Sequence, residues 1–403
     1  MSSPVLIISN ALAGGGAEVV ARQMIAHIDN SVGIVFENDD RISISGSVVH
    51  AVGHRHGGGV GYTLWINALR LVRIQREKFR LRPHCTISHL EGPNFANLLT
   101  VAGGRRLIFV HNKISESYRH RTLRNRAKYA LCRLLYPRAD CIVAVSQGIA
   151  DELVQALQLD PSKVRVHNNP VDVASIRMMA KVSDHDFAEL IEKEQYIVSV
   201  ASLTEQKNHL QMLRVFKEYV LTTNQTNEVK LVLVGDGPLR ATLQRFARDQ
   251  GLATWSYDDY DTNLREARVL FFGFQSNPYP LVAAAKALIM TSLWEGLPIS
   301  LLEAMSLGIP GVVSDSSTGI RELWKVPTIE AGKLVTRRSS LQTPFGMLMP
   351  STKDQEIDLS TWVASLHKVV SSGVDCRNRY QRDCQERAMD YDISRVVPAW
   401  RSL

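Results

Sequence analysis

Two glutamates with seven residues between them, Glu295 and Glu303, are the side chains whose type and spacing point most directly to chemistry. An apolar run at 287–290 predicts a buried strand before them, and Pro298 lies where a helix can begin. The loop between such a strand and the next helix lies at the carboxyl end of the strand, where open α/β sheets bind ligands. Carboxylates at this place accept charge-assisted hydrogen bonds from hydroxyl groups, so the pair predicts recognition of a sugar or a ribose.

Glu303 also has a purely structural explanation. Ser300 and Glu303 have the spacing of a capping box, in which the carboxylate only satisfies a backbone N–H group at the start of a helix. The residues around the glutamates favour the ligand-binding interpretation over the cap.

A glycine-rich segment at 14–16 follows the first apolar run of the chain. Gly15 and Gly16 have no side chains and therefore let another molecule approach the backbone closely. A dinucleotide site is one interpretation, since Glu37 lies after the second apolar run, where such folds place the acid that binds a ribose. The G-x-G-x-x-G fingerprint is incomplete, because Val19 replaces its third glycine.

Apolar, β-branched runs recur along the chain, with amphipathic helical stretches between most of them. The first series lies at 5–9, 32–36, 48–52, 86–89, 107–111 and 141–146, and the second at 196–201, 230–234, 269–272, 287–291 and 311–314. This alternation is typical of parallel, doubly wound sheets, and two series in 403 residues predict two α/β domains. The segment 164–172 contains Asn-Asn-Pro and no helical period, so we place the linker there, between domains at 1–172 and 173–379.

The composition is that of a globular protein. The five cysteines are odd in number and form no C-x-x-C pair, which favours a reducing compartment and predicts no metal site. No run approaches the roughly 18 apolar residues of a membrane-spanning helix, so we expect a cytoplasmic chain. The net charge of +7 indicates an anionic partner. A nucleic acid would explain the charge but neither the glutamates nor the glycines, and we expect none.

The motif S-x-x-E-G-x-P-x-x-x-L-E-A-M that contains both glutamates resembles the E-x7-E signature of retaining, family 4 nucleotide-sugar glycosyltransferases. The resemblance implies a GT-B fold, in which two facing Rossmann-like domains enclose a cleft, and a C-terminal helix at about 380–403 that packs back on the first domain. It also implies that Glu295 contacts the donor hexose and that Glu303 holds the ribose. The intervening Gly296, Leu297 and Pro298 belong to the same donor site.

Other segments extend the resemblance. The segment 200–208 corresponds to the family's diphosphate-binding position, where Lys207 fits but Ser202 stands in place of an expected arginine. The segment from Gly273 and Phe274 onward resembles the segment of this family whose backbone contacts the base of the donor nucleotide. The Gly15–Gly16 loop corresponds to one near the donor phosphates, and His111 corresponds to a residue of the acceptor pocket.

The resemblance implies a retaining hexosyltransferase with Glu295, Lys207 and His111 as its catalytic residues. Its donor would be a nucleoside diphosphate sugar, UDP-linked rather than GDP-linked, and its acceptor a hydroxyl of a saccharide or polyprenyl-linked glycan in cell-surface polysaccharide assembly. No metal and no further cofactor are implied. The alternatives are a nucleotide-sugar epimerase or phosphorylase on the same fold, or a degenerate subunit that only binds nucleotide sugar.

The segment 105–138 is strongly basic, with ten lysines or arginines against a single acid, Glu116. Within it, one helical side is apolar and predicts packing on the domain; it comprises Leu123, Ala127, Leu131, Leu134 and Leu135. The other side carries Arg119, Arg121, Arg124, Arg126, Lys128 and Arg133. A solvated basic face is the simplest explanation. The density of charge also favours attachment to an anionic membrane surface without insertion, which is our hypothesis.

Overall fold

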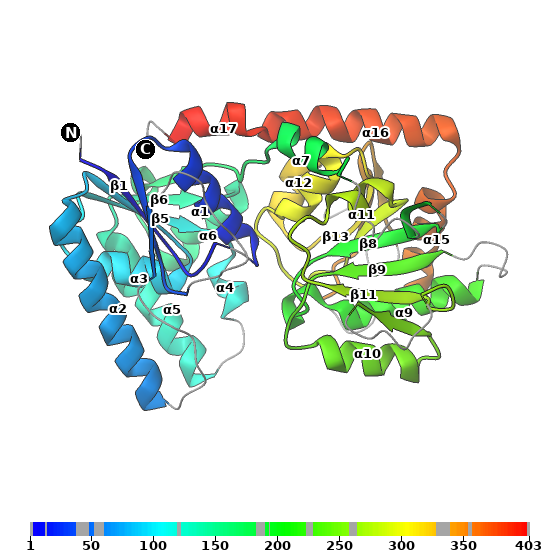
Figure 1. Ribbon diagram of the computed structural model, residues 1–403, viewed down its shortest axis with the longest axis horizontal. Helices are drawn as coiled ribbons and strands as arrows, with labels where there is room; N and C mark the ends of the chain where they lie inside the picture. Colours follow the sequence, from blue (N-terminus) through cyan, green and yellow to red (C-terminus); the bar gives the residue numbers. More distant parts are fainter. Residues whose placement is uncertain are drawn as a thin grey trace. The chain divides into compact units, whose positions relative to one another are not determined.

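The computed structural model describes residues 3–12, 14–37, 48–51, 60–118, 122–182, 190–192, 194–222, 229–257, 264–327, 339–353 and 357–400. The chain divides into two compact units (Figure 1). Unit 1 comprises Met1–Pro170 and Ser394–Leu403, and unit 2 comprises Val171–Ile393.

The described residues of unit 1 form a seven-stranded parallel sheet in the order β3-β2-β1-β4-β5-β6-β7. Its strands are β1 (Val5–Ser9), β2 (Ser31–Val35), β3 (Val48–Ala51), β4 (Cys85–His89), β5 (Arg105–Val110), β6 (Cys141–Ala144) and β7 (Val164–Val166). Every residue of β1, β4 and β6 is buried, as expected for parallel strands that are covered on both faces. The strand order reverses between β1 and β4, and such a switch point is where α/β sheets usually bind ligands.

Helices connect the strands of unit 1. They are α1 (Gly16–His27), α2 (Val60–Leu81), α3 (Glu91–Leu99), α4 (Ile114–Ser117), α5 (Leu123–Leu135) and α6 (Gln147–Leu157), with the short 3-10 helices η1 (Tyr136–Arg138) and η2 (Pro161–Lys163). Helix α3 contacts the central strands and lies between α2 and α5 (Figure 1). These three helices therefore form a layer on one face of the sheet.

The described residues of unit 2 form an eight-stranded sheet in the order β10-β11-β9-β8-β12-β13-β15-β14. Its strands are β8 (Tyr196–Val200), β9 (Lys230–Val234), β10 (Thr254–Ser256), β11 (Val269–Gly273), β12 (Ala287–Met290), β13 (Gly311–Ser314), β14 (Leu341–Thr343) and β15 (Gly346–Met349). All neighbours are parallel except β14 and β15, which form an antiparallel pair. The order reverses between β8 and β12, which makes this the switch point of unit 2.

The helices of unit 2 are α7 (Val173–Met179), η3 (Glu205–Lys207), α9 (His209–Thr222), α10 (Arg240–Asp249), α11 (Tyr279–Ala284), α12 (Ile299–Ser306), α13 (Thr318–Leu323), α15 (Leu359–Val370), α16 (Val374–Ala388) and η4 (Met389–Tyr391). The final helix, α17 (Ile393–Trp400), lies almost entirely in unit 1. Helix α16 packs on α12 so closely that a Cβ atom at Gly308 would lie 2.5 Å from Cγ of Gln381.

The predicted fold class, two doubly wound α/β domains, is confirmed, and each of the eleven predicted strands is present, although Val52 lies outside the described residues. The predicted linker at 164–172 is wrong in its first part, because Val164–Val166 pairs with β6 as the edge strand β7. The units divide after Pro170, two residues before the predicted boundary. The predicted return at about 380 is too early, because α16 packs on α12 and the return to unit 1 begins at Ser394.

The chain passes between the units twice, and the two crossings are hydrogen-bonded to each other. The N–H group of Val171 donates to the carbonyl of Tyr391 at 2.9 Å, and that of Ile393 donates to the carbonyl of Val171 at 2.9 Å. The carboxylate of Asp392 accepts from the N–H group of Val173 at 3.2 Å.

Within the described residues, no helix combines the length and the apolar character that are required to cross a membrane.

Candidate active site

The loops after β8 and β12 meet at the carboxyl edge of the sheet in unit 2. These strands are direct neighbours, with Ile197 opposite Ala287. Gln206 links the two loops twice: its carbonyl accepts from the N–H group of Leu293 at 2.8 Å, and its side-chain amide donates to the carbonyl of Trp294 at 2.9 Å. The hydroxyl of Thr291 adds a bond to the carbonyl of Lys207 at 3.2 Å. These bonds hold the turn η3 at a fixed position beside the loop that carries Glu295.

Lys207 and Glu295, two of the predicted catalytic residues, form an ion pair in which Nζ lies 2.5 Å from Oε1. Glu295 is only 5% exposed and Lys207 is half-buried. A carboxylate that is withdrawn from water requires a partner, and removing that partner from such a pair is usually strongly destabilising. The sequence placed these residues in one site, and the structure shows that each neutralises the other.

Glu303 lies one turn into α12, and its Oε1 accepts a hydrogen bond from the hydroxyl of Tyr279 at 3.0 Å. The cap of α12 is Pro298, which makes no side-chain capping bond. Ser300 is already inside the helix, so the capping-box explanation of Glu303 is wrong. The first N–H groups of α12 have no partner within the helix, and they give its start a partial positive charge beside Glu295.

The loop that carries Gly296 and Leu297 is held in place by the start of α13. The hydroxyl of Ser317 donates to the carbonyl of Gly296 at 3.0 Å and also accepts from the N–H group of Ile320. A Cβ atom at Gly319 would lie 2.0 Å from the carbonyl oxygen of Gly296, so only glycine fits there. The sequence analysis missed Ser317 and Gly319, because their contacts join segments that no local pattern connects.

Gly273 ends β11 with a φ of +65°, a conformation that favours glycine. Its carbonyl accepts from the N–H group of Gly235 at 2.7 Å, and the next residue, Phe274, is half-buried. Nη1 of Arg240 lies 3.6 Å from the position that a Cβ atom of Gly273 would occupy. The expected arginine is replaced by Ser202, and Arg240 is a cation that the structure places beside the predicted base-binding segment.

In unit 1, His111 follows β5 and contacts His89 at the end of the neighbouring strand β4. Nδ1 of His89 lies 3.0 Å from Nε2 of His111, and both side chains are buried. Burial lowers the pKa of His111 to about 3 and that of His89 well below its ordinary value, so both rings are neutral at pH 7. Their outer nitrogens, Nε2 of His89 and Nδ1 of His111, are buried without a hydrogen-bond partner.

Leu90, directly after His89, has an unusual backbone conformation. Its φ of 70° and ψ of 162° fall in a region that essentially only glycine adopts. Such a conformation costs about 1–3 kcal/mol and is found preferentially at functional sites. The sequence analysis missed His89, although two histidines at the ends of adjacent predicted strands were a usable signal.

The predicted glycine loop joins β1 to α1, and β1 is the other neighbour of β4. Gly15 precedes α1, whose first residue is Gly16. A Cβ atom at Gly15 would lie 2.5 Å from Oε2 of Glu18, because this carboxylate folds back over the loop. Burial raises the pKa of Glu18 to about 6, and the nearby Glu37 adds to the rise. The start of α1 thus contributes a carboxyl group with a raised pKa to the edge of the sheet that carries His89.

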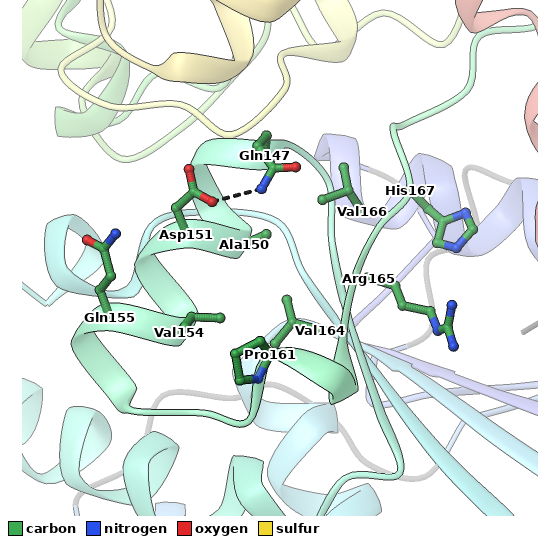
Figure 2. A pocket seen from close by; sticks show the side chains of 10 residues that line it. All are labelled: Gln147, Ala150, Asp151, Val154, Gln155, Pro161, Val164, Arg165, Val166 and His167. Carbon is green, nitrogen blue, oxygen red and sulfur yellow. Dashed lines mark hydrogen bonds between the residues drawn. The ribbon is translucent and has the colours of Figure 1, made fainter.

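An open groove of about 730 Å³ lies elsewhere on unit 1, between α6 and the edge strand β7 (Figure 2). Its rim includes Gln147, whose amide donates to Asp151 at 2.7 Å, together with Arg165 and His167. None of the residues predicted for the donor or acceptor sites lines this groove. The predicted residues Lys207, Glu295 and His111 lie instead after the strands β8, β12 and β5.

The predicted basic helix is α5, although Arg119 and Arg121 lie outside the described residues. The prediction that its apolar side packs on the domain is wrong. Of the five residues on that side, Leu135 is buried, whereas Leu123, Ala127, Leu131 and Leu134 are exposed. Cys132, with the half-buried Tyr129, is turned inward instead.

Within the described residues, no group of three or more histidine, cysteine or acidic side chains could hold a metal ion.

Two family models match the chain. The model described as "Glycosyltransferase Family 4" matches residues 14–175, and the model described as "Glycosyl transferases group 1" matches residues 182–326. Together they match most of the chain. It belongs to the group 1 and family 4 glycosyltransferases. The matched ranges contain the glycine loop and the histidine pair in one case, and Lys207, Glu295 and Glu303 in the other.

This glycosyltransferase is similar to several named proteins. It is 23% identical to an uncharacterised glycosyltransferase of Methanocaldococcus jannaschii, over 83% of its own length and 81% of that protein. It is 27% identical to the N-acetylgalactosamine-N,N'-diacetylbacillosaminyl-diphospho-undecaprenol 4-alpha-N-acetylgalactosaminyltransferase of Campylobacter jejuni, over 58% of each chain. It is 30% identical to the UDP-Gal:alpha-D-GlcNAc-diphosphoundecaprenol alpha-1,3-galactosyltransferase of Escherichia coli, over 40% of its own length and 39% of that protein.

Solved structures support the fold of the glycosyltransferase. The lipopolysaccharide outer core galactosyltransferase WaaB, in its apo form, aligns with a TM-score of 0.60 and 18% identity, over 99% of this chain and 98% of that one. Anabaena HepE in complex with UDP and glucose aligns with a TM-score of 0.69 and 16% identity, over the whole of both chains. At these identities the likeness establishes the GT-B fold alone.

Proposed function

We propose that this glycosyltransferase is a retaining hexosyltransferase that acts in the assembly of a cell-surface polysaccharide. Its donor is a UDP-linked sugar, and its acceptor is a hydroxyl of a saccharide or a polyprenyl-linked glycan. The observation that carries the proposal is the buried Lys207–Glu295 pair at the switch point of unit 2, with Glu303 one turn further along α12. The E-x7-E spacing of these glutamates supports the retaining outcome.

The ion pair suggests how the donor is received. A diphosphate carries more negative charge than a carboxylate, so it competes with Glu295 for the ammonium group of Lys207. Once Lys207 turns to the phosphates, the Glu295 carboxylate is free to accept hydrogen bonds from the hydroxyl groups of the sugar. Lys207 and the start of α12 then stabilise the charge that develops on the departing nucleoside diphosphate.

Protein groups thus replace a metal ion in this proposal. Ser202 removes one expected cation, and Arg240, beside Gly273, is the residue that we propose in its place. Glu303 is proposed to hold the ribose hydroxyls, and the backbone at Gly273 and Phe274 to meet the base. Gly296, Leu297 and Pro298 complete the donor site through their backbone.

Two kinds of similarity support the donor and the acceptor that we propose. The named relatives of Campylobacter jejuni and Escherichia coli act on diphospho-undecaprenol substrates. The Anabaena HepE structure contains UDP. The five cysteines, all of them free thiols, support the cytoplasm as the place of the reaction.

His111 is proposed to bind the acceptor, and His89 to position it. Two neutral imidazoles share two ring protons, and one of these lies in the bond between the rings. Of the two outer nitrogens, one therefore carries a proton and the other is an acceptor. Such a pair can bind a hydroxyl group as donor or as acceptor. The Gly15–Gly16 loop lies at the same edge of the sheet.

Replacing His89 by phenylalanine is expected to lower kcat/KM for the acceptor by about 10-fold to 100-fold, because the ring of His111 loses its orientation and its fixed tautomer. KM for the donor should change much less, since His89 lies in unit 1 whereas Lys207, Glu295 and Glu303 lie in unit 2. Steady-state kinetics with each substrate varied in turn measures both. His84→Phe, at an exposed position before β4, is the matched control. Equal losses for donor and acceptor would show a structural role only.

The reaction itself is tested with UDP-sugars and a polyprenyl-diphosphate-linked saccharide. We expect release of UDP that depends on the acceptor, and a product whose anomeric configuration, measured by NMR, equals that of the donor. A chelator should leave the rate unchanged. An inverted product or a requirement for magnesium would contradict the mechanism.

The same experiment separates the alternatives. An epimerase would change the donor sugar in the absence of acceptor, and a phosphorylase would require inorganic phosphate in place of the glycan. A binding subunit would bind UDP, which would raise its melting temperature, but would give no turnover with any acceptor.

A further inference from the structure

Tyr279, the first residue of α11, donates a hydrogen bond to a glutamate of another helix. Its hydroxyl lies 3.0 Å from Oε1 of Glu303, which belongs to α12, and both residues are half-buried. A hydrogen bond from a phenol to a carboxylate is charge-assisted and therefore belongs to the stronger kinds. The bond thus orients the carboxylate that is proposed to hold the ribose.

The position of Tyr279 is itself fixed. Its N–H group donates to Oδ1 of Asn277 at 3.3 Å, and the side-chain amide of Asn277 donates to the carbonyl of Met179 in α7 at 3.0 Å. The hydroxyl of Tyr196 also holds α11, because it donates to the carbonyl of Leu281 at 2.8 Å. Helix α7 contacts both α11 and α12, and all three helices belong to unit 2 (Figure 1). Since a tyrosine side chain has few rotatable bonds, its hydroxyl is presented to Glu303 from a fixed point.

Glu303 is fixed at its backbone. The hydroxyl of Ser306 donates to the carbonyl of Glu303 at 2.7 Å, and Nε of Arg177 in α7 donates to the carbonyl of Ser306 at 3.0 Å. The glutamate side chain beyond the backbone is long and flexible, and ordering such a side chain when a ligand binds reduces the affinity. The bond from Tyr279 orders the carboxylate before the ligand arrives.

We propose that Tyr279 is a positioning residue for recognition of the donor ribose, and that its hydroxyl holds the Glu303 carboxylate in the orientation that accepts hydrogen bonds from the ribose hydroxyl groups. This role depends on the proposed role of Glu303 and adds to it a residue outside the E-x7-E motif. A carboxylate can accept about four hydrogen bonds, so the phenol and the ribose hydroxyl groups can bind it at the same time.

Tyr279 also lies in the segment that is proposed to meet the base. It follows Phe274 by five residues. One continuous segment would therefore contact the base through its backbone and orient the ribose-binding carboxylate through a side chain. We expect the contribution of Tyr279 to concern the ribose hydroxyl groups and not the base or the diphosphate.

The test compares the binding of UDP with that of 2′,3′-dideoxy-UDP, which has the same base and diphosphate but no ribose hydroxyl groups. Isothermal titration calorimetry with the full chain gives both Kd values. We expect the wild type to bind the dideoxy analogue about 100-fold more weakly. Tyr279→Phe should lower this ratio by about 10-fold through weaker binding of UDP, whereas Kd for the analogue should stay within about 2-fold of the wild-type value.

Tyr196→Phe is the matched control. It also removes a hydrogen bond from a tyrosine hydroxyl to α11, but that bond ends at Leu281 and not at Glu303. It should lower the urea midpoint of unfolding, because a buried hydrogen bond is lost, and it should retain the wild-type ratio of the two Kd values. The same comparison with GDP and its dideoxy analogue covers a guanosine-linked donor, so the test does not depend on the proposed base.

Equal ratios in the wild type and in Tyr279→Phe would overturn the proposed role of Tyr279, and a lower urea midpoint would then assign its bond to stability alone. Tighter binding of UDP to Tyr279→Phe would overturn it as well, because the phenol would then occupy the place of a ribose hydroxyl. A wild type that binds each nucleotide and its dideoxy analogue equally would contradict the role of Glu303 and with it that of Tyr279. That failure is recognised in the wild type alone, before any variant is compared.

Discussion

Glu295→Gln is expected to lower the rate of sugar transfer by about 100-fold or more, because the neutral amide cannot provide the charge that the proposed mechanism uses at the donor sugar. The substitution keeps the size of the side chain, and the amide oxygen of glutamine still accepts a hydrogen bond from the ammonium group of Lys207. The fold should therefore survive. Single-turnover kinetics with saturating UDP-sugar measures the effect on the chemical step.

The matched control is Glu205→Gln. Glu205 is an exposed glutamate on the same turn as Lys207, so its substitution changes the charge near the site without removing the buried carboxylate. It should retain transfer close to the wild-type rate. Turnover of Glu295→Gln at the wild-type rate would exclude this residue from the reaction.

Lys207→Met is expected to lower transfer by about 100-fold or more as well, since the departing diphosphate loses a cation. It should also destabilise unit 2 by about 3 kcal/mol, because Glu295 is left buried without a partner. Glu295→Gln leaves no unpaired buried charge of this kind, so the two single variants should differ in stability although both lose activity. Urea unfolding followed by tryptophan fluorescence measures the difference.

The double variant Lys207→Met/Glu295→Gln separates the structural role of the pair from its catalytic role. It should recover most of the stability that Lys207→Met loses, because no unpaired charge remains, and it should stay inactive. Its loss of activity should be smaller than the product of the two single losses, as expected for residues that act together. Independent, multiplicative losses would show that the ion pair has no part in the mechanism.

The core strands were predictable because parallel strands that are buried on both faces read as continuous apolar runs. Lys207 and Glu295 were assigned to one donor site by the family resemblance of the two segments that contain them, and not by the pattern of apolar runs. Their direct contact was not predictable, because it depends on the order β8-β12 and on the bonds from Gln206. The three-residue strand β7 was missed because so short a segment has no period.

Helix α5 shows where a pattern is misleading. Its leucines form an apolar side that resembles a face buried in the domain, but the inward positions belong to Cys132 and Leu135 together with Tyr129. Periodicity defines which residues share a side and does not define which side is covered. The strained backbone of Leu90 was equally unpredictable from the sequence, because the residue type leucine does not indicate the backbone conformation that tertiary packing imposes.

The paired crossings at Val171 and Asp392 affect how the chain responds to proteolysis. A single cut beside Pro170 leaves the α17 segment connected to unit 2, and a cut beside Ser394 leaves the other crossing intact. Two cuts are needed to release either unit with all of its segments. We therefore expect unit 1 to be obtained alone only from a gene that fuses α17 to residues 1–170, and unit 2 only from a gene that omits both of these segments.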